Sequence, residues 1–116
     1  MGIKHDEYKL QVEVVKYLRA NGWVVISIPN ERNLGVADAL RMRAAGLTKG
    51  APDLIAFKPA DKPYHTAEPW WFELKTEKGK RSREQECMEA LADYLCINYK
   101  IIRKLEDLPC YKEEGK

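Results

Sequence analysis

Two short runs of this chain carry residue types that can hold a metal ion beside an activated water. The first is Pro52-Asp53 and the second, twenty residues later, is Glu73-Leu74-Lys75. Two nearby carboxylates repel each other unless a cation lies between them. Oxygen ligands of this kind favour Mg²⁺ or Mn²⁺ over softer metals. With the ammonium of Lys75 beside them, the expected chemistry is phosphodiester hydrolysis. The two runs are short and made of common residues, so the prediction depends on the elements that position them.

Both runs belong to segments that are typical of β-strands, residues 53–57 and 70–75. Side chains alternate along a strand, so Glu73 and Lys75 share one face. The other face carries the apolar set Trp70, Phe72 and Leu74. We expect the apolar set to pack under a helix and the two charged residues to project into a cleft. The alternatives are a solvent-facing ion pair, worth at most about 1 kcal/mol, and a turn role for Asp53.

The first expected helix, residues 5–21, places polar side chains on its apolar face. At about 100° per residue, one stripe contains Glu7, Gln11, Val14 and Leu18. Glu13 points away from this stripe. A carboxylate on a buried face is costly unless it is paired, hydrogen-bonded or bound to a metal, so Glu7 is a candidate ligand. The alternative is a solvated acid in the first turn, favoured by the helix dipole.

A second helix is predicted to start at Ser82, because Ser82-Arg83-Glu84-Gln85 has the form of a capping box. Its apolar stripe is expected to contain Met88, Leu91, Ala92 and Leu95. Capping alone explains Gln85, so a role for this residue in a site is a second interpretation.

The order of the expected elements is α-β-α-β-β-α-β. They cover residues 5–21, 23–28, 36–45, 53–57, 70–75, 82–95 and 99–103, followed by a short helical ending at 104–110 and a frayed tail at 111–116. The 116 residues have the size of one domain, and no linker or repeat divides them. We therefore predict a single α/β domain over residues 1–116, with a central mixed sheet flanked by helices.

The composition, 45% hydrophobic and 33% charged, is that of an ordinary soluble globular protein. No apolar run is long enough to span a bilayer, and the first residues lack an apolar secretory core. The three cysteines have no zinc-ligand spacing and are expected to be reduced thiols in the cytoplasm.

The net charge of +2 is small, but the basic residues are clustered. Such a cluster beside a site suits a polyanion, because neutralising phosphates releases counterions. The candidate nucleic-acid contacts are Lys49, Lys78, Lys80, Arg81 and Arg83, together with Asn30 in a polar loop. The alternative is a solvated charged loop with no partner.

Five separated patches of the sequence are considered together: Glu7 with Gln11, Ile28-Pro29-Asn30-Glu31, the run from Gly46 to Leu54, Glu73-Leu74-Lys75 and Ser82-Arg83-Glu84-Gln85. In combination they resemble the VRR-NUC family of the PD-(D/E)xK nuclease superfamily, in its small stand-alone phage and bacterial form. They follow the family's order and cover the chain from about Asp6 to Arg103. Ala51 departs mildly from the family's pattern and changes no chemistry.

The resemblance implies a restriction-endonuclease-like core and a Mg²⁺-dependent endodeoxyribonuclease, with Mn²⁺ as a substitute. Asp53, Glu73 and Lys75 would form the catalytic set, and Glu7 would be an additional metal-site carboxylate. Gln85 would support the site, and the Leu74 carbonyl is expected as a further metal ligand.

The small stand-alone members favour a homodimer that cuts branched DNA of the Holliday-junction type, in the cytoplasm of a bacterial or phage-infected cell. No membrane and no organic cofactor are expected. The alternatives are a flap or nicking nuclease and a non-catalytic nucleic-acid-binding module of the same fold.

Overall fold

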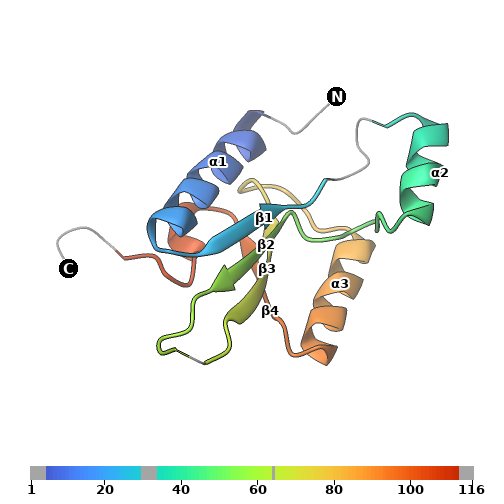
Figure 1. Ribbon diagram of the computed structural model, residues 1–116. Helices are drawn as coiled ribbons and strands as arrows, with labels where there is room; N and C mark the ends of the chain where they lie inside the picture. Colours follow the sequence, from blue (N-terminus) through green and yellow to red (C-terminus); the bar gives the residue numbers. More distant parts are fainter. Residues whose placement is uncertain (1–4, 30–33, 64, 113–116) are drawn as a thin grey trace.

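The computed structural model describes residues 5–29, 34–63 and 65–112 (Figure 1). Its helices and strands follow the predicted order. They are α1 (His5–Ala20), β1 (Val24–Ser27), α2 (Val36–Ala44), β2 (Leu54–Lys58), β3 (Glu68–Leu74), α3 (Arg83–Tyr94), β4 (Asn98–Ile102) and the 3₁₀ turn η1 (Leu105–Asp107). Across these described ranges, no helix combines the length and the apolar character that crossing a membrane requires.

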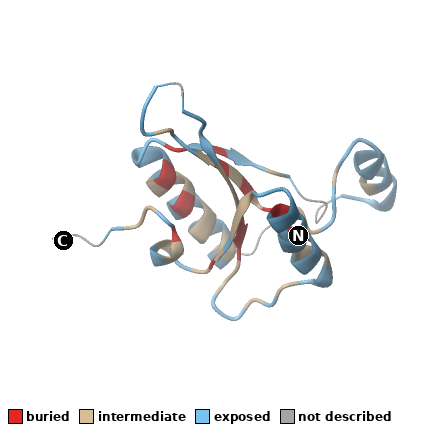
Figure 2. Cartoon of the chain, turned by 90° about the horizontal axis from the view of Figure 1, so that it is seen from below, coloured by how far each residue is buried: buried red, intermediate tan, exposed pale blue. Residues whose placement is uncertain are grey.

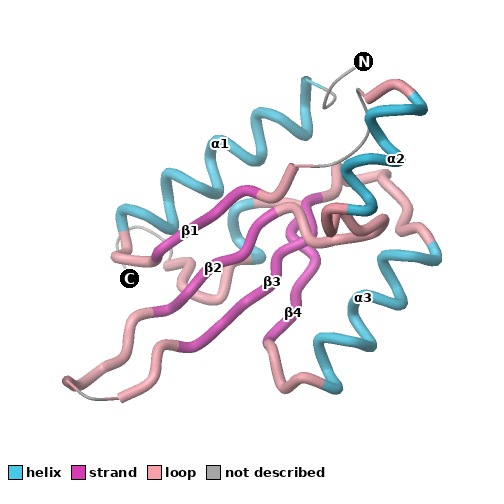
Figure 3. The backbone as a smooth tube through the Cα atoms, turned by 45° about the vertical axis from the view of Figure 1, so that its right-hand side comes forward, coloured by secondary structure: helices cyan, strands magenta, loops and turns pink. Residues whose placement is uncertain are grey.

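The four strands form one mixed sheet in the order β1-β2-β3-β4 (Figure 3). β1 and β3 both run antiparallel to β2, whereas β4 runs parallel to β3. The parallel pair needs a crossover, and α3 provides it. Leu54 lies opposite Phe72 in the β2–β3 register. This register brings the beginning of β2 beside the end of β3, where the two runs with candidate chemistry lie.

The hydrophobic core lies between α1 and one face of the sheet. Val14 and Leu18 of α1 are fully buried, as the helical periodicity predicts. They join Leu54, Phe72 and Leu74 in one cluster of buried residues. The expected packing of the apolar β3 face under a helix is therefore confirmed, and Figure 2 shows buried residues gathered along α1 and the sheet. The remaining sheet face is left for the charged residues.

The helix α3 lies on the opposite side of the sheet from α1 (Figures 1 and 3). Only two of the four residues predicted for its apolar stripe are buried. Met88 and Ala92 are buried, but Leu91 is 42% exposed and Leu95 is 48% exposed. The expectation that all four residues pack inward is wrong, because α3 contacts the sheet at β4 and leaves Leu91 and Leu95 exposed.

The helix α2 contributes nothing to this core. None of its residues is buried, and it stands away from the rest of the molecule (Figures 1 and 2). Val36 is 80% exposed and Leu40 is 58% exposed. An isolated helix of nine residues is marginal in water, so a partner surface would stabilise it.

The start of the carboxyl-terminal tail is docked onto α1. The Tyr111 ring stacks on Tyr17 with ring centroids 5.6 Å apart, and the Lys112 N–H donates to the Tyr17 hydroxyl at 2.9 Å. The prediction that the tail is frayed from residue 111 is therefore wrong for these two residues. Residues 113–116 lie outside the described part of the chain.

Candidate active site

Asp53 is fixed by hydrogen bonds to both neighbouring strands. Its N–H donates to the Phe72 carbonyl at 3.0 Å, and its own carbonyl accepts from the Ile28 N–H at 2.9 Å. Its side-chain Oδ2 also accepts from the Leu74 N–H at 2.7 Å. The Asp53 carboxylate therefore lies at the end of β3, in a position set by the main chain.

Glu73 lies on the same face of the sheet as Asp53. Leu54, Phe72 and Leu74 all belong to the core under α1, and alternation turns the intervening residues to the opposite face. The Glu73 side chain is almost completely buried, at 1% exposure. One oxygen, Oε1, accepts a hydrogen bond from the Tyr99 hydroxyl, and Oε2 lies 3.4 Å from Nε of Arg81.

A cavity of about 440 Å³ opens beside these carboxylates. Asp53, Lys75 and Gln85 all line it, so three of the four predicted catalytic residues share one cavity. The remaining lining residues include Ile28, Pro29, Leu47, Thr48, Lys49, Gly50, Ala51 and Ser82. Glu73 is buried and is not among the lining residues. An open cavity with a carboxylate, an ammonium and an amide is suited to a polar, charged ligand.

A close backbone contact holds one wall of the cavity. Gly50 has a φ of +83°, and a Cβ at this position would lie 2.6 Å from the main-chain carbon of Glu84. Only glycine avoids both the strained dihedral angle and the overlap. The loop before Asp53 is thereby packed against the beginning of α3, which carries Gln85.

The predicted capping box at the start of α3 is confirmed. The Gln85 N–H donates to Oγ of Ser82 at 3.1 Å, and the Ser82 N–H donates to Oε1 of Gln85 at 2.9 Å. The amide oxygen of Gln85 is thus engaged in the cap, and the amide nitrogen is the group left for the cavity. This nitrogen is a hydrogen-bond donor. It suits a phosphate oxygen or a water better than the Lys75 ammonium, which is itself a donor.

The helix α1 carries Glu7, the remaining predicted metal-site acid. Glu7 and Gln11 are partly buried and Glu13 is exposed, as predicted. Gln11 Nε2 donates to Oγ of Ser27 at 3.3 Å. Among the described residues, however, no three acids, histidines or cysteines are grouped closely enough to hold one metal ion. A role of Glu7 at the metal site, directly or through water, stays a prediction.

The expected nucleic-acid contacts divide into two groups. Lys49 lines the main cavity, and Lys78, Lys80 and Arg83 are exposed. Arg81 is different, because its side chain is only 18% exposed and pairs with two glutamates. Arg81 is therefore an internal ion-pair residue rather than a surface phosphate contact. Asn30 lies outside the described residues.

With this geometry established, comparison with known proteins gives a single informative result. No protein-family model matches the chain, and no curated protein matches it. Among solved structures, the chain is similar to one described as a VRR_NUC domain, with a TM-score of 0.58 and 89% of each chain covered. The fold is that of a VRR_NUC domain. The sequence identity is 18%, so the likeness carries the fold alone, and the roles of residues depend on the contacts described above.

Within this VRR_NUC fold, Tyr99 is a site residue that the sequence did not reveal. Tyr99 is on β4, the parallel neighbour of β3, and nothing local distinguishes it from an ordinary strand tyrosine. Burial, and then the hydrogen bond to Glu73, raises the pKa of the Tyr99 hydroxyl well above its usual range. The hydroxyl therefore stays protonated at physiological pH and donates a hydrogen bond to Glu73.

The carboxylates of the candidate site have the chemistry of ligands for a hard divalent cation. Asp53 and Glu73 supply carboxylate oxygens on one face of the sheet, the ligand type that Mg²⁺ and Mn²⁺ prefer. Oε2 of Glu73 is buried and accepts no hydrogen bond. A buried carboxylate oxygen left in this state is costly, and a cation or its water would satisfy it. The Leu74 carbonyl remains a predicted further ligand.

Proposed function

We propose that this protein is a Mg²⁺- or Mn²⁺-dependent endodeoxyribonuclease. The observation that carries the proposal is the placement of Asp53 beside Glu73 on one sheet face, next to a cavity that also holds Lys75 and Gln85. The carboxylates would hold the cation, which lowers the pKa of a bound water and offsets charge on the phosphate. The fold likeness to a VRR_NUC domain supports a nuclease-type domain.

The side chains around the cavity have distinct roles in this proposal. The Lys75 ammonium donates to the phosphate or to the attacking water and stabilises the charge that develops there. The Gln85 amide nitrogen donates to the same anion, since its oxygen caps α3. The Asp53 carboxylate keeps its position through the Leu74 N–H. Lys49, at the mouth of the cavity, contacts the DNA backbone.

Alanine substitutions test the proposal directly. Asp53→Ala, Glu73→Ala and Lys75→Ala are assayed on a four-way DNA junction with Mg²⁺, and each should lose at least about 100-fold in cleavage rate, the scale of removing one preorganised electrostatic group. Glu13→Ala is the control, because Glu13 is an exposed acid on the far side of the α1 stripe. If a variant cuts at the wild-type rate, the substituted residue is not catalytic.

We further propose that the enzyme acts on branched DNA as a homodimer. This domain would recognise the DNA backbone and its shape rather than a base sequence. Two symmetric incisions need two sites, which a C2 dimer provides. The exposed apolar residues Val36 and Leu40 of α2 support such an assembly, because a second copy would cover them.

The dimer is tested by sedimentation at micromolar concentration. Leu40→Glu should convert a dimer into a monomer, because a charge is costly in an apolar interface. Leu91→Glu is a matched control, since Leu91 is also an exposed helical leucine but lies on α3. A wild-type protein that is strictly monomeric counts heavily against junction resolution.

The choice of substrate is tested with a panel of junction, flap, nicked and linear DNAs, each with Mg²⁺, Mn²⁺ or chelator. Preferential cutting of the junction supports the proposal. Preferential cutting of the flap or nicked DNA assigns a different structural specificity. Salt-dependent binding without metal-dependent turnover on any substrate indicates a non-catalytic binding module.

A further inference from the structure

Arg81 has an unusual position for a residue in a basic loop. Its guanidinium lies between two glutamates, with Nη1 at 2.7 Å from Oε1 of Glu89 and Nε at 3.4 Å from Oε2 of Glu73. It also lies over the Tyr99 ring, 5.7 Å from the centroid. Arg81 is therefore a positive charge inside the proposed site, where a divalent cation would also be attracted.

The two ion pairs of Arg81 differ in length and in burial. The pair with Glu89 is short, and Glu89 is 49% exposed. The pair with Glu73 is long, and both Nε of Arg81 and Oε2 of Glu73 are buried without a hydrogen-bond partner. Arg81 thus compensates the charge of Glu73 without satisfying its second oxygen. Nη2 of Arg81 also donates to the Gln85 carbonyl at 3.3 Å and to the Tyr99 hydroxyl at 3.5 Å. Glu89 is the closer of its two acidic partners.

We propose that Arg81 is a positioning residue that sets the affinity of Glu73 for a divalent cation. It balances the charge of the buried Glu73 carboxylate, and Glu89 would hold the guanidinium if Glu73 served as a ligand to a divalent cation. This inference rests on the proposed function, since it assigns Glu73 to the metal. It adds a pair, Arg81 and Glu89, that the catalytic proposal does not require.

The two members of the pair are expected to shift metal affinity in opposite directions. Neutralising Arg81 removes a positive charge close to Oε2 of Glu73, so the cation is repelled less. Neutralising Glu89 leaves Arg81 with Glu73 as its remaining acidic partner, so the guanidinium competes more strongly for that carboxylate. A residue with a purely structural role would not produce opposite shifts.

The experiment measures Mn²⁺ binding to the full-length protein by electron paramagnetic resonance, at mildly alkaline pH and without DNA. Arg81→Gln should bind Mn²⁺ more tightly, by about tenfold from Coulomb's law in water. Glu89→Gln should bind it several-fold more weakly. Glu86→Gln is the matched control, because it removes the same charge from an exposed position on the same helix, and it should bind like the wild type.

The outcomes separate this inference from the proposed function. A wild-type protein that binds no Mn²⁺ overturns the metal-dependent function and this inference with it. A wild type that binds Mn²⁺, with Arg81→Gln and Glu89→Gln shifted in the same direction or not at all, overturns only the role of Arg81. Circular dichroism checks the fold of each variant. If Arg81→Gln does not fold, Glu89→Gln decides: weaker binding than Glu86→Gln supports the inference, and equal binding overturns it.

Discussion

Asp53 is hydrogen-bonded to the main chain on both sides of Glu73. Its N–H donates to the carbonyl of Phe72 at 3.0 Å, and its Oδ2 accepts from the N–H of Leu74 at 2.7 Å. The two acids are therefore held side by side by the backbone of β2 and β3, independently of any ion between them. The Asp53 side chain therefore has two roles that can be tested separately: its hydrogen bond to the main chain and its negative charge.

The first prediction concerns that separation. Asp53→Asn keeps an oxygen that accepts from the Leu74 N–H but removes the charge, so its stability should stay close to wild type while cleavage falls at least about 100-fold. Asp53→Ala should lose cleavage and also about 1–3 kcal/mol of stability, because the buried N–H loses its acceptor. Urea unfolding and a cleavage assay measure the two effects. Wild-type cleavage by Asp53→Asn would show that the charge is not needed.

The second prediction concerns the loop wall of the cavity. Gly50 and Gly22 both have a φ of +83°, but a Cβ at Gly22 would meet nothing within 4 Å. Gly22→Ala should cost about 1–2 kcal/mol for the left-handed conformation. Gly50→Ala should cost a further 1–3 kcal/mol or so, because the new Cβ overlaps the Glu84 backbone. Equal losses in chemical unfolding would contradict the proposed packing of the loop against α3.

The third prediction concerns the turn that follows Lys75. Arg103 Nη1 donates to the carbonyls of Thr76 and Gly79 at 2.8 Å and of Glu77 at 3.2 Å. Arg103→Ala should lose about 1–3 kcal/mol of stability and reduce cleavage, because the turn beside the Lys75 side chain is released.

The control for the Arg103 substitution is Lys100→Ala, an exposed position on β4 three residues earlier in the chain. It should stay within about 0.5 kcal/mol of the wild type in thermal or urea unfolding. An Arg103→Ala protein as stable and active as this control would show that the three carbonyl contacts are dispensable.

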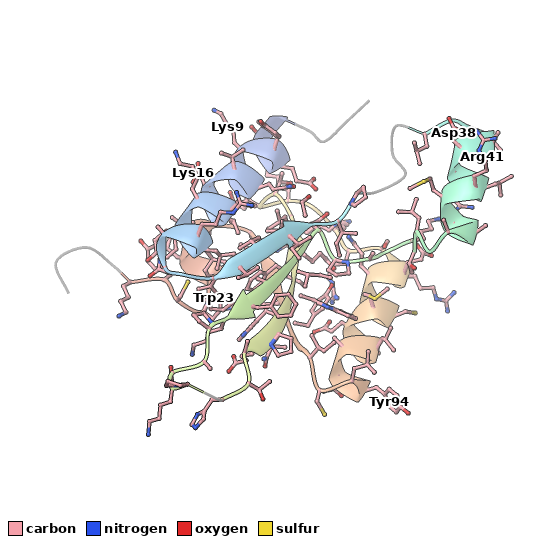
Figure 4. The ribbon with its side chains drawn as sticks, viewed as in Figure 1. Lys9, Lys16, Trp23, Asp38, Arg41 and Tyr94 are labelled. Carbon is pink, nitrogen blue, oxygen red and sulfur yellow. The ribbon has the colours of Figure 1, made fainter. Side chains whose placement is uncertain are left out.

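The fourth prediction concerns the DNA contacts. Lys78 and Lys80 are exposed beyond β3. A Lys78→Ala/Lys80→Ala variant should therefore bind junction DNA with a salt slope smaller by about 0.9 for each phosphate that a lysine no longer neutralises. The control is Lys9→Ala/Lys16→Ala, two lysines that project from α1 away from the sheet (Figure 4). Fluorescence anisotropy over a salt series, in chelator, gives both slopes. Identical slopes for the two variants would assign the binding surface elsewhere.

Much of the fold follows from short-range patterns in the sequence. The alternation in β3 separates Phe72 and Leu74 from Glu73, and the helical stripe of α1 identifies Val14 and Leu18 as core residues. The capping box at Ser82 places the start of α3. Each of these features depends on residues within a few positions of one another. They can therefore be predicted without knowledge of any tertiary contact.

The tertiary structure decided which partner each of these faces meets. Arg81 belongs to the same basic run of the sequence as Lys78 and Lys80. In the structure, however, its side chain lies between Glu73 and Glu89. Tyr99 becomes a site residue only because β4 lies parallel beside β3.

Leu91 on α3 and Leu95 at its carboxyl-terminal cap are exposed although their spacing fits burial. A periodic pattern predicts whether one face of a helix or strand is apolar or charged. Which group lies opposite that face is settled by segments far away in the chain, because ion pairs and packing depend on distances that only the assembled sheet and helices determine.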